Sequence, residues 1–184
     1  MATIPKVLTY EEWLKMPEVQ DGIEEVVNGE VRIMPPNKAS HGDVVDNLYD
    51  IVRPQIDPKM TRVRISNFGI VIRKDPLTTR APDLAIFIRS NIVLIDGYFH
   101  SAPELVVEVL SPSNTRGEIQ GKLRDYASIG VPEAWILSGE ARTIEILHLN
   151  SNGDLETAGI LNEGEIRPKL FPHIIVDVGA IWPD

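Results

Sequence analysis

Two short, almost wholly apolar stretches constrain the fold of this chain more than any other feature of its sequence. They read Asp-Leu-Ala-Ile-Phe-Ile at 83–88 and Glu-Leu-Val-Val-Glu-Val-Leu at 104–110. Runs of this length without polar alternation are typical of β-strands that are covered on both faces. Because helices usually cover such faces, the chain is predicted to form a sheet between helical layers, an α/β architecture.

Local patterns elsewhere in the chain predict the helices and hairpins of such a fold. Three helices are expected. A capping-box pair, Thr9 with Glu12, indicates a helix over 9–16, and apolar positions at helical spacing indicate helices over 41–56 and 117–129. Pro54 is expected to shorten the second helix. Runs of β-type residues between turn signals indicate the remaining strands, at 25–33 (a hairpin around Asn28-Gly29), 62–73, 133–137, and 143–149 with 155–161 (a C-terminal hairpin).

Length and composition favour a single domain over residues 1–184. The chain has 184 residues, of which 43% are hydrophobic, and that suits one core. No apolar stretch approaches the roughly 20 residues that a membrane-spanning helix needs. The first residues lack the basic segment and apolar run of a signal peptide, and there are no cysteines. We therefore expect a cytoplasmic protein without membrane contact.

The net charge of -9 argues against indiscriminate binding to nucleic acid. The charge is uneven, however, because residues 57–89 carry seven basic and three acidic side chains, a local balance of +4 that leaves -13 for the rest. Two interpretations stay open. The basic side chains either lie on solvated strand faces or form a local patch that faces phosphate groups.

Asp83 and Glu108 are carboxylates within the two apolar stretches. An ionised carboxylate in apolar surroundings is strongly disfavoured unless a cation or several hydrogen-bond donors compensate it. An arginine partner or a shifted pKa would explain either residue alone. If the two strands are neighbours, both carboxylates can instead converge on one divalent cation, for which Mg²⁺ is a natural candidate because it takes hard oxygen ligands.

An ordered series of motifs surrounds these two acids. The series comprises a hairpin from Glu25 to Glu30, His41, Pro82-Asp83, Glu108-Val109-Leu110-Ser111-Pro112-Ser113, Lys122 four residues before Tyr126, and Gly130-Val131-Pro132-Glu133-Ala134-Trp135. In this order the motifs resemble the Uma-type branch of the PD-(D/E)XK nuclease superfamily, and the resemblance spans nearly the whole chain. It implies a restriction endonuclease-like core, that is, a mixed β-sheet flanked by helices, with N- and C-terminal β-hairpins.

The resemblance also implies a metal site and a displaced lysine. Asp83, Glu108 and the backbone carbonyl of Val109 would bind Mg²⁺ or Mn²⁺. Leu110 stands where the superfamily usually has its lysine, and the resemblance implies that Lys122 supplies it from the following helix. Lys122 borders the apolar stripe of that helix, so its stem can run along apolar surface toward a buried site. The alternatives are a solvated lysine and an inactive site.

Glu25 and His41 complete the candidate catalytic set. Glu25 corresponds to the acid that precedes the metal-binding pair in such sites, with Glu24 and Glu30 as rivals for the role and an exposed hairpin charge as the alternative. His41 would orient water or phosphate, or it is a surface residue at the start of a helix.

Two functions follow from these observations. The first is a restriction-type endonuclease that depends on Mg²⁺ or Mn²⁺ and hydrolyses phosphodiester bonds in DNA, acting as a homodimer. The second is a non-catalytic relative that uses the same fold to bind nucleic acid or a protein. Neither a zinc-binding pair of histidines nor a glycine-rich phosphate loop is present.

Overall fold

A six-stranded mixed sheet forms the centre of the computed structural model, which describes residues 7–17, 19, 22–36, 38–66, 68–112 and 114–183. The strands follow the order β12-β11-β10-β9-β6-β3. β9 and β10 are parallel, and every other neighbouring pair is antiparallel. The bounds are β3 (Thr61–Ile65), β6 (Leu84–Ile88), β9 (Leu105–Val109), β10 (Glu133–Ser138), β11 (Thr143–Leu149) and β12 (Leu155–Leu161).

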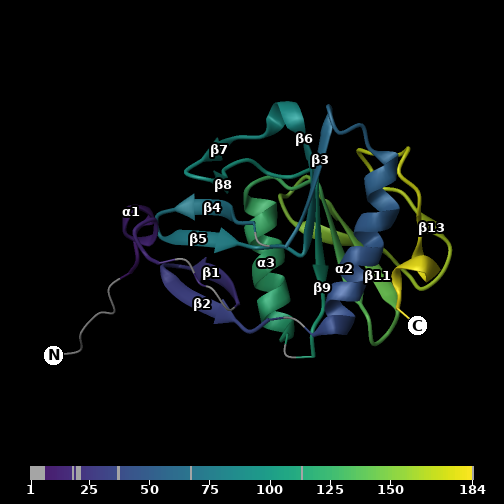
Figure 1. Cartoon of the computed structure of the whole chain (residues 1–184), viewed down its shortest axis with the longest axis horizontal. Helices are drawn as coiled ribbons and strands as arrows, with labels where there is room; N and C mark the ends of the chain where they lie inside the picture. Colours follow the sequence, from purple (N-terminus) through teal and green to yellow (C-terminus); the bar gives the residue numbers. More distant parts are fainter. Residues whose placement is uncertain are drawn as a thin grey trace.

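Two helices cover the opposite faces of this sheet, α2 (Ala39–Val52) and α3 (Arg116–Ser128) (Figure 1). Side chains alternate between the faces along each strand. Leu84 and Ile86 therefore join the core beneath α2, whereas Ala85 and Phe87 join the core beneath α3. This explains why the stretch 83–88 lacks polar alternation, and it confirms the predicted sheet between helical layers.

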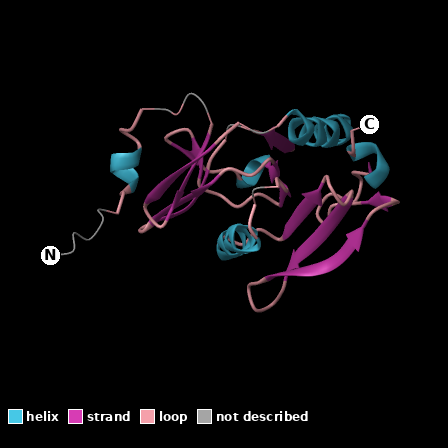
Figure 2. Cartoon of the chain, turned by 90° about the horizontal axis from the view of Figure 1, so that it is seen from below, coloured by secondary structure: helices cyan, strands magenta, loops and turns pink. Residues whose placement is uncertain are grey.

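Smaller sheets lie on the N-terminal side of the molecule. The elements there are α1 (Tyr10–Trp13), β1 (Ile23–Val27), β2 (Glu30–Met34), β4 (Ile70–Lys74), β5 (Leu77–Arg80), β7 (Leu94–Ile95) and β8 (Tyr98–Phe99). Figures 1 and 2 both place these sheets on one side of α3 and the six-stranded sheet on the other. The predicted hairpin is present as β1–β2, and its turn uses Asn28 at φ 53° and Gly29 at φ 79°.

The remaining chain packs on the α2 face. Short elements follow β12 there, namely β13 (Glu165–Ile166), β14 (Val176–Asp177) and the 3-10 turn η3 (Val178–Ile181). Ile174 and Trp182 belong to the same core as α2. Two further 3-10 turns, η1 (Arg53–Gln55) and η2 (Arg89–Asn91), complete the elements. No helix in the described part of the chain is long and apolar enough to cross a bilayer.

The prediction of one strand over 62–73 was wrong. The segment contains two strands in different sheets, because the chain leaves β3 through Ser66 at φ 47° and re-forms extended structure only at β4. The helix predicted over 41–56 ends at Val52, and η1 follows around Pro54. The helix predicted over 9–16 is shorter than expected, although Thr9 and Glu12 do form the capping box.

Ile86→Ala tests whether the central strand holds the sheet together. Ile86 is fully buried beneath α2, so the substitution leaves a cavity and should lower the free energy of unfolding by about 2–5 kcal/mol. Urea denaturation measures the loss. Ile160→Ala on β12 is the control, because Ile160 is 64% exposed and its truncation should change little. Equal effects of the two variants would contradict the assigned core.

Candidate active site

A lysine ammonium lies between two buried carboxylates at the junction of α3, the six-stranded sheet and the N-terminal hairpin. The Nζ atom of Lys122 is 2.8 Å from Oε2 of Glu108 on β9 and 3.2 Å from Oε1 of Glu25 on β1. All three residues are buried. The structure therefore brings together three of the residues that the sequence singled out, although more than 80 positions separate Glu25 from Glu108.

Arg80, the last residue of β5, ties the hairpin acid to α3. Its Nη1 donates to Oε2 of Glu25 over 2.7 Å, and its Nε and Nη2 both donate to Oδ2 of Asp125 at 2.8 and 2.7 Å. The backbone N–H of Ala81 donates to the other oxygen of Glu25 at 3.1 Å. Glu25 is thus fixed in place by the residues directly before Pro82-Asp83.

Asp83 is held beside this cluster by two contacts. Its Oδ2 accepts from the backbone N–H of Val109 at 2.7 Å, and its Oδ1 lies 2.8 Å from Nε2 of His41 in the first turns of α2. An ionised carboxylate has no proton to give, so Nε2 of His41 is the donor in that state. The buried Nδ1 of His41 has no hydrogen-bond partner among the described residues.

Strand register places Asp83 and Glu108 on the same face. Ala85 is paired with Val106 in the antiparallel ladder of β6 and β9, and paired residues share a face. Asp83 stands just before β6, two positions before Ala85, and Glu108 follows Val106 by two, so continuing the register sets the two acids opposite each other at this end of the ladder. The two strands are neighbours, as the convergence of the two acids requires.

The N-cap of α3 fixes which of its side chains face the sheet, and two of these side chains contact Glu108. Thr115 caps the helix and forms a capping box with Glu118. Lys122 and Tyr126, four residues apart, then share the face that packs on the sheet. The Tyr126 hydroxyl donates to Oε1 of Glu108 at 2.5 Å, while Lys122 reaches Oε2.

Burial and mutual repulsion shift the protonation of this cluster. The pKa of Glu108 is raised to about 7; burial is the largest cause, the charges of Asp83 and Glu25 add to it, and Lys122 opposes it. Burial alone would lower the pKa of Lys122, but Glu108, Glu25 and Asp83 together raise it, so the ammonium stays charged. Burial and the neighbouring Glu108 also raise the pKa of Tyr126 well above its usual value, which keeps its hydroxyl protonated.

The chemistry of the cluster fits a divalent cation. Four carboxylates (Glu25, Asp83, Glu108, Asp125) face one guanidinium and one ammonium, which leaves a formal charge of -2. Each oxygen of Asp83 and Glu108 has one contact among the described residues, and a carboxylate oxygen has two lone pairs. The described residues do not, however, form a ready cluster of three or more His, Asp or Glu side chains around one point.

Comparison with known proteins identifies the family of this chain. Residues 10–179 match the model of the Uma2 family, whose description is "Putative restriction endonuclease". The chain belongs to the Uma2 family. A solved structure, described as a "putative nuclease belonging to DUF820" from Anabaena variabilis, shares the fold with a TM-score of 0.77 and 17% identity, over 95% of this chain and 97% of that one. No curated protein matches the chain.

The family motif residues that lie outside the cluster have other partners. Glu24, a rival to Glu25, accepts from Trp13 Nε1 at 2.6 Å, and Glu30 is exposed on β2. Leu110, at the usual lysine position of the superfamily, packs against the core beneath α3. Ser113, the last residue of the Glu108 motif, lies outside the described residues.

Two members of the cluster in this Uma2 protein were not predicted from the sequence. The sequence motifs give no role to either Arg80 or Asp125. The signal for Arg80 was its position at the end of Leu-Thr-Thr-Arg, two residues before Pro82-Asp83. Asp125 lies three residues after Lys122, hence on a neighbouring part of the same helix face.

Glu108→Gln should remove a pH-dependent part of the protein's stability. Between the usual pKa of 4.5 and about 7, the folded protein holds a proton on Glu108 that the unfolded chain has released. The resulting stabilisation is present at low pH and is lost as the pH rises through 7. From about pH 5 to about pH 8, the free energy of unfolding of wild type should therefore fall relative to Glu108→Gln, by on the order of 3 kcal/mol at most.

Metal-free denaturation curves at several pH values measure this difference. Glu24→Gln is the matched control, because Glu24 precedes the cluster residue Glu25 and contacts Trp13 instead. Its stability should follow the wild-type pH dependence. If Glu108→Gln also follows the wild-type curve in parallel, Glu108 does not titrate in this range.

Proposed function

We propose that this protein is a divalent-metal-dependent, restriction-type endonuclease that hydrolyses phosphodiester bonds in DNA. The observation that carries the proposal is the contact of the Lys122 ammonium with Glu25 and Glu108, with Asp83 near enough to act on it electrostatically and a formal charge of -2 left over in the cluster. Membership of the Uma2 family supports the reaction class. A site of net negative charge needs a cation before it can approach a phosphate group.

Asp83 and Glu108, together with the backbone carbonyl of Val109, would hold Mg²⁺ or Mn²⁺. When bound, such an ion supplies Lewis acidity toward a phosphate oxygen and lowers the pKa of water. The two side chains come from neighbouring strands, and the Val109 N–H fixes Asp83 relative to β9. This backbone contact makes the spacing of the two acids a property of the sheet.

Lys122 would act as the displaced lysine of the superfamily. Its ammonium is held by Glu108 and Glu25 on the sheet face of α3, so it can stabilise negative charge that develops on the phosphate. Glu25 would position Lys122 and assist the base step. His41 would act as a positioning residue, because its Nε2 fixes the orientation of Asp83.

We also propose that the protein acts as a cytoplasmic homodimer. A two-fold arrangement presents two identical sites, and cleavage of both strands of a duplex needs two cutting events. Light scattering of the purified chain, alone and with duplex DNA, measures the oligomeric state.

Asp83→Asn and Lys122→Met should abolish nuclease activity. With plasmid and single-stranded DNA in Mg²⁺ or Mn²⁺, the rate of cleavage should fall by at least about 100-fold for each variant, because each removes a group that binds the metal or stabilises developing charge. Glu25→Gln should also reduce the rate. Glu24→Gln changes the adjacent acid outside the cluster and should cleave at the wild-type rate. Cleavage that survives both Asp83→Asn and Glu108→Gln would refute the assignment.

Mn²⁺ should stabilise the wild-type protein. A ligand that binds only the folded state raises its stability with concentration, so the thermal midpoint should rise as Mn²⁺ is added. The same titration should leave Asp83→Asn unchanged, whereas Glu24→Gln should respond like wild type. A rise of equal size in Asp83→Asn would place the ion elsewhere.

A non-catalytic relative on the same fold is the second candidate function. The observation that favours it is that Lys122 and Tyr126 already contact both oxygens of Glu108. Such a protein would bind nucleic acid or a protein partner without cleaving DNA. Binding of DNA without cleavage in either metal, and without a Mn²⁺-dependent rise in thermal midpoint, would favour this second function.

A further inference from the structure

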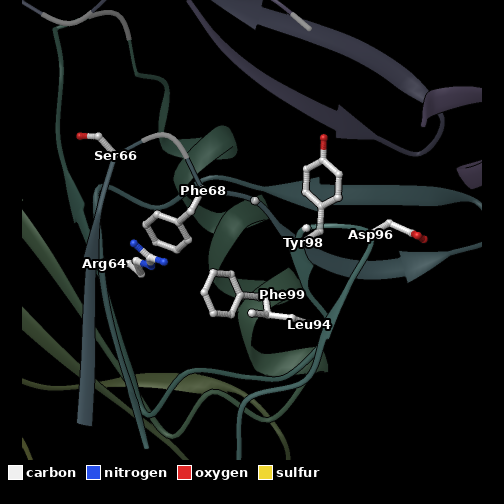
Figure 3. A pocket seen from close by; sticks show the side chains of 9 residues that line it. Arg64, Ser66, Phe68, Leu94, Asp96, Tyr98 and Phe99 are labelled. Carbon is white, nitrogen blue, oxygen red and sulfur yellow. The ribbon is translucent and has the colours of Figure 1, made fainter. Parts of the chain in front are cut away.

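A pocket of about 370 Å³ lies beside the carboxylate cluster and has no part in the chemistry described so far. Its walls come from the end of β3, the connection to β4 and the β7–β8 hairpin (Figure 3). They include Arg64, Phe68 and Phe99, so one cation and two aromatic rings share the cavity; Tyr98 also lines it, but its ring packs on Trp13. Ligand sites combine apolar walls with a few polar groups in this way.

Arg64 has an unused donor in this pocket. Its Nε is buried and has no hydrogen-bond partner among the described residues. A buried donor without an acceptor costs about 1–3 kcal/mol, so such groups usually have a partner or await one. In Figure 3 the Arg64 guanidinium extends toward the rings of Phe68 and Phe99. A bound water or an acceptor on a ligand would supply the missing partner.

The pocket and the proposed catalytic site share one face of the sheet. Arg64 is paired with Ala85 in the β3–β6 ladder, and Asp83 lies two residues before Ala85 on the same face. Ser66, another pocket residue, donates its backbone N–H to the carbonyl of Asp83 at 3.2 Å. Two residues along a strand span roughly 7 Å. A ligand group in the pocket would therefore lie near a ligand group bound at Asp83.

The aromatic walls suit a flat ligand. Phe68 and Phe99 have ring centroids 5.8 Å apart at 81°, and Phe99 stacks on the buried Phe87 at 4.4 Å. Phe68 is only half-buried, so part of its ring is free of the core. Nucleobases stack on such rings whatever their sequence. Asp96 also lines the pocket, but its carboxylate points away from Arg64 in Figure 3 and accepts from the Tyr10 hydroxyl at 3.1 Å.

We propose that this pocket binds one nucleobase of the substrate strand, next to the phosphate that is cut, and that Arg64 selects a purine with two acceptors, such as guanine. The proposal rests on the proposed nuclease function, because it takes the strand to pass Asp83. Arginine pairs with the O6 and N7 acceptors of guanine through two parallel hydrogen bonds. Arg64 would thereby give the enzyme a base preference beside its cleavage site.

Binding to single-stranded oligothymidylates tests the pocket. One strand carries a single guanine, a second carries 7-deazaguanine, which lacks the N7 acceptor, and a third carries thymine only. Fluorescence anisotropy with Ca²⁺ in place of Mg²⁺ measures affinity without cleavage. Wild type should bind the guanine strand about ten- to one-hundred-fold more tightly than the all-thymine strand, with most of this preference lost for 7-deazaguanine.

Three arginine variants separate the pocket from general electrostatics. Arg64→Gln and Arg64→Lys should bind all three strands equally, since both lack the planar fork and Arg64→Lys keeps the charge. Arg62→Gln removes the same charge from the same strand and face but outside the pocket, so it should keep the guanine preference. Thermal midpoints near that of wild type show that the variants are folded.

The outcomes for the pocket and for the nuclease are distinguishable. A wild-type protein without guanine preference, or a preference that survives Arg64→Gln, overturns the pocket and leaves Asp83-dependent cleavage untouched. An Arg64-dependent preference in a protein that cuts no DNA supports the pocket and refutes the nuclease. Equal losses in Arg64→Gln and Arg62→Gln on all strands would show that Arg64 contacts phosphate only, which also overturns the proposal.

Discussion

The contact of the Lys122 ammonium with Glu25 and Glu108 is the interaction on which the rest of the candidate site depends. It joins the N-terminal hairpin, the six-stranded sheet and α3 at one buried point. Buried ion pairs of this kind add little net stability, because desolvation offsets much of the attraction, but loss of one partner leaves an uncompensated charge. The cluster therefore constrains how the hairpin, the six-stranded sheet and α3 are placed relative to one another, and it adds little to the free energy of unfolding.

The same arrangement leaves the site with excess negative charge when only protein groups are counted. Acids outnumber bases within it, and burial raises the pKa of Glu108 to about 7. Such a site resists full ionisation on its own. Strongly shifted carboxylates with specific charged neighbours are common at functional sites, where stability is reduced in favour of chemistry. The imbalance is the physical reason for assigning a role to the cluster at all.

Local sequence patterns predicted the scaffold of the fold well. The apolar stretches around Asp83 and Glu108 identified β6 and β9, and the apolar spacing of the next helix placed Lys122 at the border of its core-facing side. The single strand expected over 62–73 failed because its break depends on the backbone conformation of Ser66, which has no strong local signal. Small strands such as β7 and β8 are too short to show a period.

Contacts between distant segments were the harder part to predict. Arg80 and Asp125 meet across 45 positions, and nothing near either residue indicates the other. The pocket around Arg64 was equally hidden, because loop residues and two two-residue strands complete it. The family motifs conveyed some of this long-range information, since their order along the chain reflects residues that the fold brings together.

The ladder between β6 and β9 has a consequence for how this chain tolerates change in length. Side chains alternate faces along a strand, so a shift of β9 by one residue would turn Glu108 toward α2 and bring an aliphatic neighbour to the site. A shift by two residues would restore the face but displace the acid along the strand. Insertions or deletions in the connection at 89–104 leave the register of the two strands unchanged, whereas inside either strand a single-residue change in length inverts the site.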